Sequence, residues 1–148
     1  AMTKRKKALK NKLWVKAIVK LINAQAIRNG NYFRWHDSGD IQSIEHLKKI
    51  IEVAKLTPNI LHWLPTREKK IIGKVPDLEI PKNLIIRLSA TMIDKHSSWD
   101  GNTSSVITNT LFAKKNDFVC LASKQGGQCK KCRACWNKDI SNIAYLKH

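Results

Sequence analysis

Apolar side chains recur at the three- and four-residue spacing of an amphipathic helix in two stretches of the chain. The spacing predicts one helix over residues 4–27, with most of its lysines on the opposite face. It predicts a second helix over residues 42–56, with Ser43 or Asp40 as the N-cap. The sequence Asn29-Gly30-Asn31 is expected to end the first helix.

Short apolar runs predict strands around the second helix. Residues 32–36, 60–64 and 84–89 are such runs, and the third is nearly continuous, as is typical of a buried parallel strand. The order strand, helix, strand, helix-like turn, strand indicates right-handed βαβ units. We therefore predict an α/β fold, with a small, mainly parallel sheet flanked by helices.

The last third of the chain has a less regular pattern. Residues 92–105 are rich in Ser, Asn and Asp and predict a loop. Residues 106–108 predict a short strand, residues 136–143 a last short helix and residues 145–146 a short terminal strand. A length of 148 residues fits a single domain.

Positive charge is concentrated at both ends of the chain. The sequence has 28 Lys and Arg against 11 Asp and Glu, a net charge of +17. Residues 1–36 contain no acidic residue, and residues 114–148 are also basic. Such a field attracts polyanions, so nucleic acid is a predicted partner of the basic N- and C-terminal regions. A genome that favours Lys, Ile and Asn codons explains the same charge without a partner.

The hydrophobic pattern does not indicate a membrane protein. Hydrophobic residues make up 43% of the chain, and no apolar run is long enough to span a bilayer. Lys16 and Lys20 interrupt the apolar stretch over residues 13–26, which makes it a poor signal-peptide core. We therefore expect a cytoplasmic protein, in a reducing environment that favours metal binding over disulfides.

All four cysteines lie close together near the C-terminus, in the spacing C-x8-C-x2-C-x2-C. Three thiols at this spacing, joined by a fourth from a glycine-containing loop, are typical of a metal site. The predicted ligands are Cys120, Cys129, Cys132 and Cys135. A [4Fe–4S] cluster is favoured, because structural zinc usually takes two separate C-x2-C knuckles, whereas here the middle thiol belongs to both. Zinc is the first alternative, and disulfides or free thiols are the others.

Four cysteine ligands leave no iron open to a substrate, so we expect a structural or electron-transfer role, with a redox partner in the second case. The predicted domain then has three parts: a basic amphipathic helix, a βαβ core and a C-terminal metal-binding segment. These parts cover residues 1–28, 32–113 and 114–148.

Polar residues follow the ends of all three predicted strands. Asp37 and Asp40 follow the first strand, Thr66 and Arg67 the second, and Ser89 the third. Ligands of parallel sheets gather beyond the carboxyl ends of the strands, so these five are candidate ligand-binding residues. Asp40 is also explained as a helix cap and Asp37 as a turn former. The sequence has no phosphate-binding loop and no nucleophile elbow, so no catalytic residue is assigned.

Four blocks of the sequence form a specific combination: HDSGD, LPTRE, PKN followed by a strand and a serine, and the cysteine block. Over residues 32–148 they resemble the gene product 88 family of phage proteins. The blocks map onto these positions: Asp37, Gly39, Asp40, Thr66, Arg67, Asn83, Ser89 and the four cysteines.

This resemblance implies a viral source, and hence the cytoplasm of the host cell. The family is distantly similar to radical-SAM-like proteins, which implies a partial barrel-like sheet and supports the iron–sulfur prediction. Longer members carry an upstream cysteine motif ending in C-Y-A, but no cysteine precedes Cys120 here.

The predicted function is therefore that of a phage-encoded [4Fe–4S] protein with a structural or electron-transfer role. One alternative is a zinc-stabilised nucleic-acid-binding module. The other is a degenerate radical-SAM-like enzyme whose strand-end residues still bind a small ligand.

Overall fold

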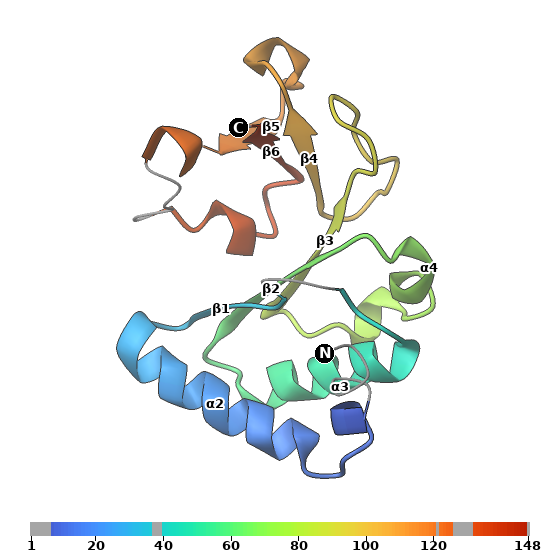
Figure 1. Cartoon of the computed structure of the whole chain (residues 1–148), viewed down its shortest axis with the longest axis vertical. Coiled ribbons are helices and arrows are strands. Elements are labelled where there is room, and N and C mark those ends of the chain that lie inside the picture. Colours follow the sequence, from blue (N-terminus) through green and yellow to red (C-terminus); the bar gives the residue numbers. More distant parts are fainter. Residues whose placement is uncertain (1–6, 37–39, 121, 126–131, 148) are drawn as a thin grey trace. The chain divides into compact units, whose positions relative to one another are not determined.

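The structure, a computed structural model, describes residues 7–36, 40–120, 122–125 and 132–147. No helix within these ranges is long and apolar enough to cross a membrane. The helices, strands and 3-10 turns (η) are, in chain order (Figure 1): α2 Trp14–Asn29, β1 Tyr32–Arg34, α3 Ile44–Leu56, β2 Leu61–Thr66, α4 Lys69–Ile72, η1 Asp77–Glu79, β3 Leu84–Ser89, β4 Thr103–Ile107, η2 Thr110–Phe112, β5 Asp117–Cys120, η3 Ala122–Gln125, η4 Ala134–Trp136 and β6 Asn142–Leu146.

The strands form one six-stranded sheet in the order β1-β2-β3-β4-β6-β5. The pairs β3–β4, β4–β6 and β5–β6 are parallel. The longest of these pairings runs from Thr103 opposite Asn142 to Ile107 opposite Leu146. The prediction of an α/β fold with a mainly parallel sheet and flanking helices is confirmed.

The chain divides into two compact units. The first unit consists of Ala1–His62 and Glu68–Leu84, and the second of Trp63–Arg67 and Ile85–His148. Each unit has its own buried hydrophobic residues. Both units combine two separate segments of the chain, and a single folding domain stays a prediction.

Helix α2 of the first unit begins later than the sequence pattern indicates. The expected single helix over residues 4–27 is interrupted: residues 7–9 are helical, residues 10–13 form a turn, and α2 begins at Trp14. The side-chain oxygen of Asn11 accepts a hydrogen bond from the Leu13 N–H at 2.9 Å, and such a local bond competes with the helical pattern. The helix ends at Gly30, as predicted, where φ is +86°.

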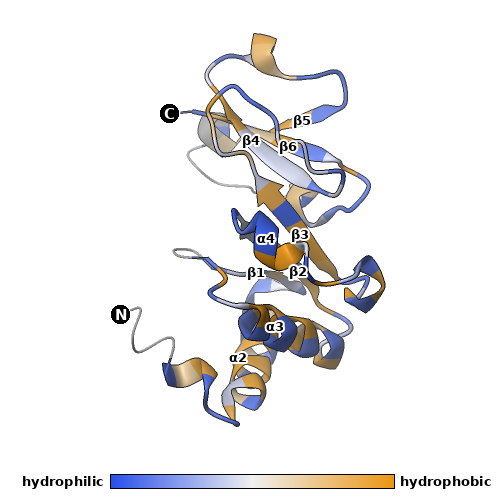
Figure 2. Cartoon of the chain, turned by 90° about the vertical axis from the view of Figure 1, so that its right-hand side faces the viewer, coloured by the Kyte–Doolittle hydropathy of each residue, from blue (hydrophilic) through white to orange (hydrophobic). Residues whose placement is uncertain are grey.

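Helix α3 begins at Ile44, directly after Ser43, one of its two predicted N-caps. The Ser43 hydroxyl accepts a hydrogen bond from the His46 N–H at 3.1 Å, so Ser43 rather than Asp40 is the N-cap. Leu47 and Ile50 lie fully buried on its inner face. Helices α2 and α3 contact each other and lie side by side in Figure 1. Hydrophobic and hydrophilic residues are mixed along both helices in Figure 2, as expected for amphipathic helices.

Asn83 connects the end of α3 to the start of β2. Its side-chain amide donates to three backbone carbonyls, those of Ala54 at 2.9 Å, Thr57 at 3.0 Å and Ile60 at 2.9 Å. These groups lie where α3 ends and the chain turns, and two of them also accept backbone N–H groups: Ala54 from Thr57 at 3.2 Å and Thr57 from Ile60 at 3.0 Å. Asn83 is therefore a structural residue that closes this turn.

Replacing Asn83 by aspartate is expected to lower the free energy of unfolding by about 3 kcal/mol, because an acceptor then faces three carbonyl oxygens. Urea unfolding measures the change. The same substitution at exposed Asn59 is the control, with an expected change within about 0.5 kcal/mol. Equal unfolding curves for the two variants would contradict the role of Asn83.

Strand β6 of the second unit begins within an expected helix. The prediction of a helix over residues 136–143 is wrong, because residues 137–141 are turn or irregular and β6, which pairs with strands on both sides, begins at Asn142. Ile143 and Ala144 are fully buried there. A strand buried on both faces is a continuous apolar run, which periodicity cannot distinguish from a buried helical turn.

Strand β4 has polar residues in buried positions. It is pale in Figure 2, because Thr and Ser have intermediate hydropathy. The Thr103 hydroxyl donates to Asn142 Oδ1 at 2.8 Å, and Asn142 Nδ2 donates to the Ser105 hydroxyl at 3.1 Å. This ladder of side chains satisfies the buried polar groups of β4 and β6, and so fixes their register.

Candidate metal centre

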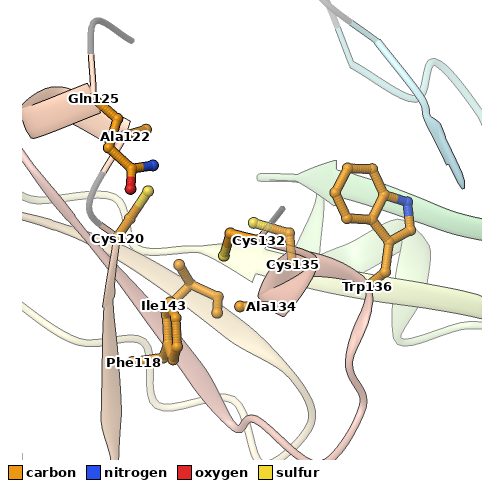
Figure 3. Close-up of a pocket in the computed structure, with 9 residues that line it drawn as sticks. All are labelled: Phe118, Cys120, Ala122, Gln125, Cys132, Ala134, Cys135, Trp136 and Ile143. Atoms are coloured by element: carbon orange, nitrogen blue, oxygen red, sulfur yellow. The ribbon is translucent and has the colours of Figure 1, made fainter. Parts of the chain in front are cut away.

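Three of the four cysteines line one cavity in the second unit. Cys120 ends β5, Cys135 lies in η4, and Cys132 lies shortly before η4. The cavity has a volume of about 120 Å³, and Figure 3 shows the three thiol groups facing it. The three are free thiols. Cys129, the fourth predicted ligand, lies outside the described residues.

The remaining walls of the cavity are almost entirely apolar. They are formed by Phe118, Ala122, Gln125, Ala134, Trp136 and Ile143. Trp63 packs edge-on against Trp136, with 5.4 Å between the ring centroids. Several thiolates in such surroundings need nearby positive charge, because burying an unpaired charge is costly. A bound metal would supply that charge.

A buried arginine fixes the turn that carries Cys135. Arg87 lies in β3 and is fully buried. Its guanidinium donates to six backbone carbonyls at 2.7–3.4 Å, those of Thr103, Ala134, Cys135, Asn137, Ile140 and Ser141. Burial lowers the pKa of Arg87, while Cys135 and Tyr145 act in the opposite direction. Arg87 therefore sets the backbone position of one candidate ligand.

Sequence reasoning did not identify Arg87 as a site residue, although a signal was present. It interrupts the apolar run of a predicted buried strand. An arginine in that position has to find several acceptors inside the protein.

Tyr145 contacts the cavity thiols from β6. Its hydroxyl lies 3.0 Å from the Cys135 sulfur, and its backbone is opposite Cys120 in the β5–β6 pairing. Burial, followed by the neighbouring Cys135, raises the pKa of Tyr145 well above its usual value. The side chain is therefore a neutral phenol that can donate its hydrogen to sulfur. Hydrogen bonds to ligand sulfurs are one way in which proteins tune iron–sulfur clusters.

The three described thiols line one cavity, but they are not arranged as a metal-binding group. Among the described residues, no group of three or more His, Cys, Asp or Glu side chains could hold a metal ion. The predicted set is complete only with Cys129. Thiolates select zinc, copper(I) and iron–sulfur clusters. The cavity is roughly eight times the smallest volume that holds one water, so an inorganic core of several atoms fits.

The five strand-end candidates are distributed over both units. Asp40 belongs to the first unit and lines a different cavity from that of the cysteines. Thr66 is buried and Arg67 exposed, and both belong to the second unit with Ser89. Asp37 lies outside the described residues. A ligand-binding role for the five together stays a prediction.

Comparison with known proteins identifies a family but no well-described relative. No curated protein and no solved structure is significantly similar to the chain. The sequence model of the family described as Gene product 88 matches residues 1–138, which is most of the 148-residue sequence. The chain therefore belongs to the gene product 88 family of phage proteins.

Proposed function

We propose that this phage protein binds a [4Fe–4S] cluster through Cys120, Cys129, Cys132 and Cys135. The observation that carries the proposal is that three thiols, from two segments of the chain, line one cavity. The fourth cysteine, Cys129, is separated from Cys132 by two residues, the same spacing that separates Cys132 from Cys135. A converging set of free thiols is typical of a metal site rather than of a disulfide framework.

The cavity favours a cluster over a single zinc ion. Zinc binds sulfur at about 2.3 Å, so its four thiolates have to converge on one point. A cubane is larger, and its ligands are spread around its corners. A cavity of about 120 Å³ among the thiols provides room for the larger object.

The role that we propose is structural or electron-transferring. Four cysteine ligands occupy every iron of a cubane, so no iron is left to activate a substrate. Tyr145 offers a hydrogen bond to the Cys135 sulfur, and Trp136 lies in the wall of the cavity. Both features suit a cluster that is screened from water. Electron transfer would require a redox partner.

We also propose that the protein works in the host cytoplasm and contacts nucleic acid through its basic ends. The supporting observation is the net charge of +17, with no acidic residue among residues 1–36. Binding to a single-stranded oligonucleotide that weakens steeply with salt would support this contact. Absence of such binding would refute it.

Anaerobically reconstituted protein is expected to contain about four iron atoms and about four sulfides per chain. Its visible absorption should bleach on reduction. Replacing any one of the four cysteines by serine should reduce the iron content to less than about half. The control is Ala122→Ser, which adds a hydroxyl to the same cavity without removing a thiol and should keep the full content. Iron and acid-labile sulfide analysis measures both.

A colourless protein with about one zinc per chain would refute the cluster and support the zinc alternative. Thermal unfolding of the cluster-free protein separates the two roles. Loss of the folded second unit indicates a structural role. Retained folding, together with reversible oxidation and reduction of the bound cluster, indicates electron transfer.

A further inference from the structure

The first unit contains a second and larger cavity. Its volume of about 380 Å³ lies within the range of about 300–1,000 Å³ that is typical of ligand pockets. It is separate from the cysteine cavity in its residues and in its unit. Its lining consists of Ala8, Leu9, Trp14, Ile18, Phe33, Trp35, His36, Asp40, Gln42 and His46.

Aromatic rings form much of this cavity. The ring planes of Trp14 and Trp35 are inclined by 26°, with 6.4 Å between their centroids. Phe33 packs edge-on against Trp35 at 5.1 Å. The Trp35 N–H donates to His62 Nδ1 at 3.0 Å, which fixes the orientation of the indole. Such rigid and flat walls suit a planar ligand.

Polar groups from the segment before α3 line the same cavity. The side-chain oxygen of Gln42 is buried and has no hydrogen-bond partner within the described part of the chain. The Gln42 backbone N–H donates to His46 Nδ1 at 3.1 Å. The lining therefore includes the Gln42 amide oxygen, while the Asp40 carboxylate already accepts from the Ile41 N–H at 2.7 Å. Buried acceptors normally have a donor, so this end of the cavity calls for a ligand that carries N–H groups.

The sequence segment that supplies most of the lining is basic, and one lysine ammonium lies near the lining residue Trp14. Residues 1–36 have ten Lys and Arg and no acidic residue. The Lys49 ammonium lies 6.0 Å from the centre of the Trp14 ring and donates to the Leu9 carbonyl. An anionic group attached to a planar ligand would therefore be attracted to this side of the unit.

We infer that this cavity binds an amino-bearing nucleobase, stacked against tryptophan, with its amino group directed to Gln42. Adenine, cytosine and guanine have an exocyclic amino group, whereas uracil presents a carbonyl oxygen there. The base can belong to a free nucleotide or to an unpaired position of a single strand, because both have the same base and phosphate.

Titration calorimetry with AMP, CMP, GMP and UMP tests the inference. At least one of the amino-bearing nucleotides should bind at least about tenfold more tightly than UMP, which corresponds to the loss of one good hydrogen bond. Short oligo(dC) and oligo(dT) form the second arm. Binding of a mononucleotide would identify a free nucleotide as the ligand. Binding of oligo(dC) without mononucleotide binding would identify an unpaired base of a single strand. Both results support the inference.

Gln42→Leu and Trp14→Leu should each weaken binding at least about tenfold. The matched controls are Gln25→Leu, at an exposed position of α2, and Trp99→Leu, in the other unit, and neither should change the affinity. Circular dichroism shows which variants fold. If Trp14→Leu does not fold, the affinity of Gln42→Leu alone tests the inference. Two results would overturn the inference: no saturable binding of any of these probes, or equal binding by the wild type and Gln42→Leu.

Discussion

Arg87→Met is expected to lower the free energy of unfolding of the metal-free protein by about 4 kcal/mol. Methionine keeps most of the aliphatic volume but has no hydrogen-bond donor. The substitution would leave six backbone carbonyls of the second unit without the guanidinium that they now share. Denaturant unfolding measures the change. The turn that carries Cys135 would also lose its anchor, so a reduced metal content should accompany the loss of stability.

Two further variants separate the donor geometry of Arg87 from its charge. Arg87→Lys keeps a positive charge but has one ammonium in place of a planar fork, so an intermediate loss of about 2 kcal/mol is expected. Arg34→Met is the control: it is the same arginine-to-methionine change at an exposed position of β1, and the free energy of unfolding is expected to change by no more than about 1 kcal/mol. If Arg87→Met were as stable as Arg34→Met, the carbonyls would have to be satisfied in another way, and the anchoring role would be wrong.

Arg87 also illustrates which features of the structure can be predicted from the local sequence pattern. Its apolar run predicted a buried strand, and β3 has the predicted bounds, 84–89. The carbonyls that it binds come from β4, from η4 and from the segment between η4 and β6, far along the chain. Local pattern establishes that a strand is buried, but it does not indicate which distant backbone groups will face a polar side chain within it.

Elements determined by interactions between residues close in the sequence were predicted more accurately than elements determined by distant segments. Helix α3 was predicted to within two residues at its start and correctly at its end, because its periodicity and its Ser43 cap are local. Strand β6 was missed over most of its length, because its position between β4 and β5 depends on pairing with distant strands. The start of α2 was missed because one side chain, Asn11, interrupts an otherwise regular pattern.

The candidate sites follow the same rule. Cysteine spacing predicted a metal site; three of the four thiols line one cavity, and metal binding by them stays a prediction. The same spacing gives no indication of Tyr145, which reaches Cys135 only through the pairing of β5 with β6. The second cavity was not predicted, because its lining comes from α2, from β1 and from the segment that leads into α3, and only folding brings these together.

His62 is held in a neutral form by its hydrogen bonds. Its Nδ1 accepts from the Trp35 N–H, so the ring proton lies on Nε2 and is donated to the Thr57 hydroxyl at 2.7 Å. That hydroxyl then donates to the Val53 carbonyl at 2.8 Å. A second proton on the ring would face the indole N–H with another donor. Burial lowers the pKa of His62 to about 4, in agreement with this geometry.

Acidification from pH 7 to pH 4 is expected to destabilise the first unit by about 3 kcal/mol through His62 alone. The unfolded histidine has a pKa of 6.5 and the folded one about 4, so the unfolded chain binds more protons between these values. The stabilisation is therefore fully present above pH 6.5 and is lost as the pH falls to about 4. His46 adds a similar loss, since burial, followed by the neighbouring His36, lowers its pKa to about 4.

Urea unfolding at a series of pH values, in wild type and in His62→Gln, measures the contribution of this histidine. A glutamine amide can accept from Trp35 and donate to Thr57, so the variant keeps the hydrogen-bond pattern but cannot titrate. Its free energy of unfolding should fall by about 3 kcal/mol less than that of the wild type between pH 7 and pH 4. Identical pH dependence in the two proteins would show that His62 is protonated as easily in the folded chain as in the unfolded one. The chain of donors from Trp35 to Val53 would then be wrong.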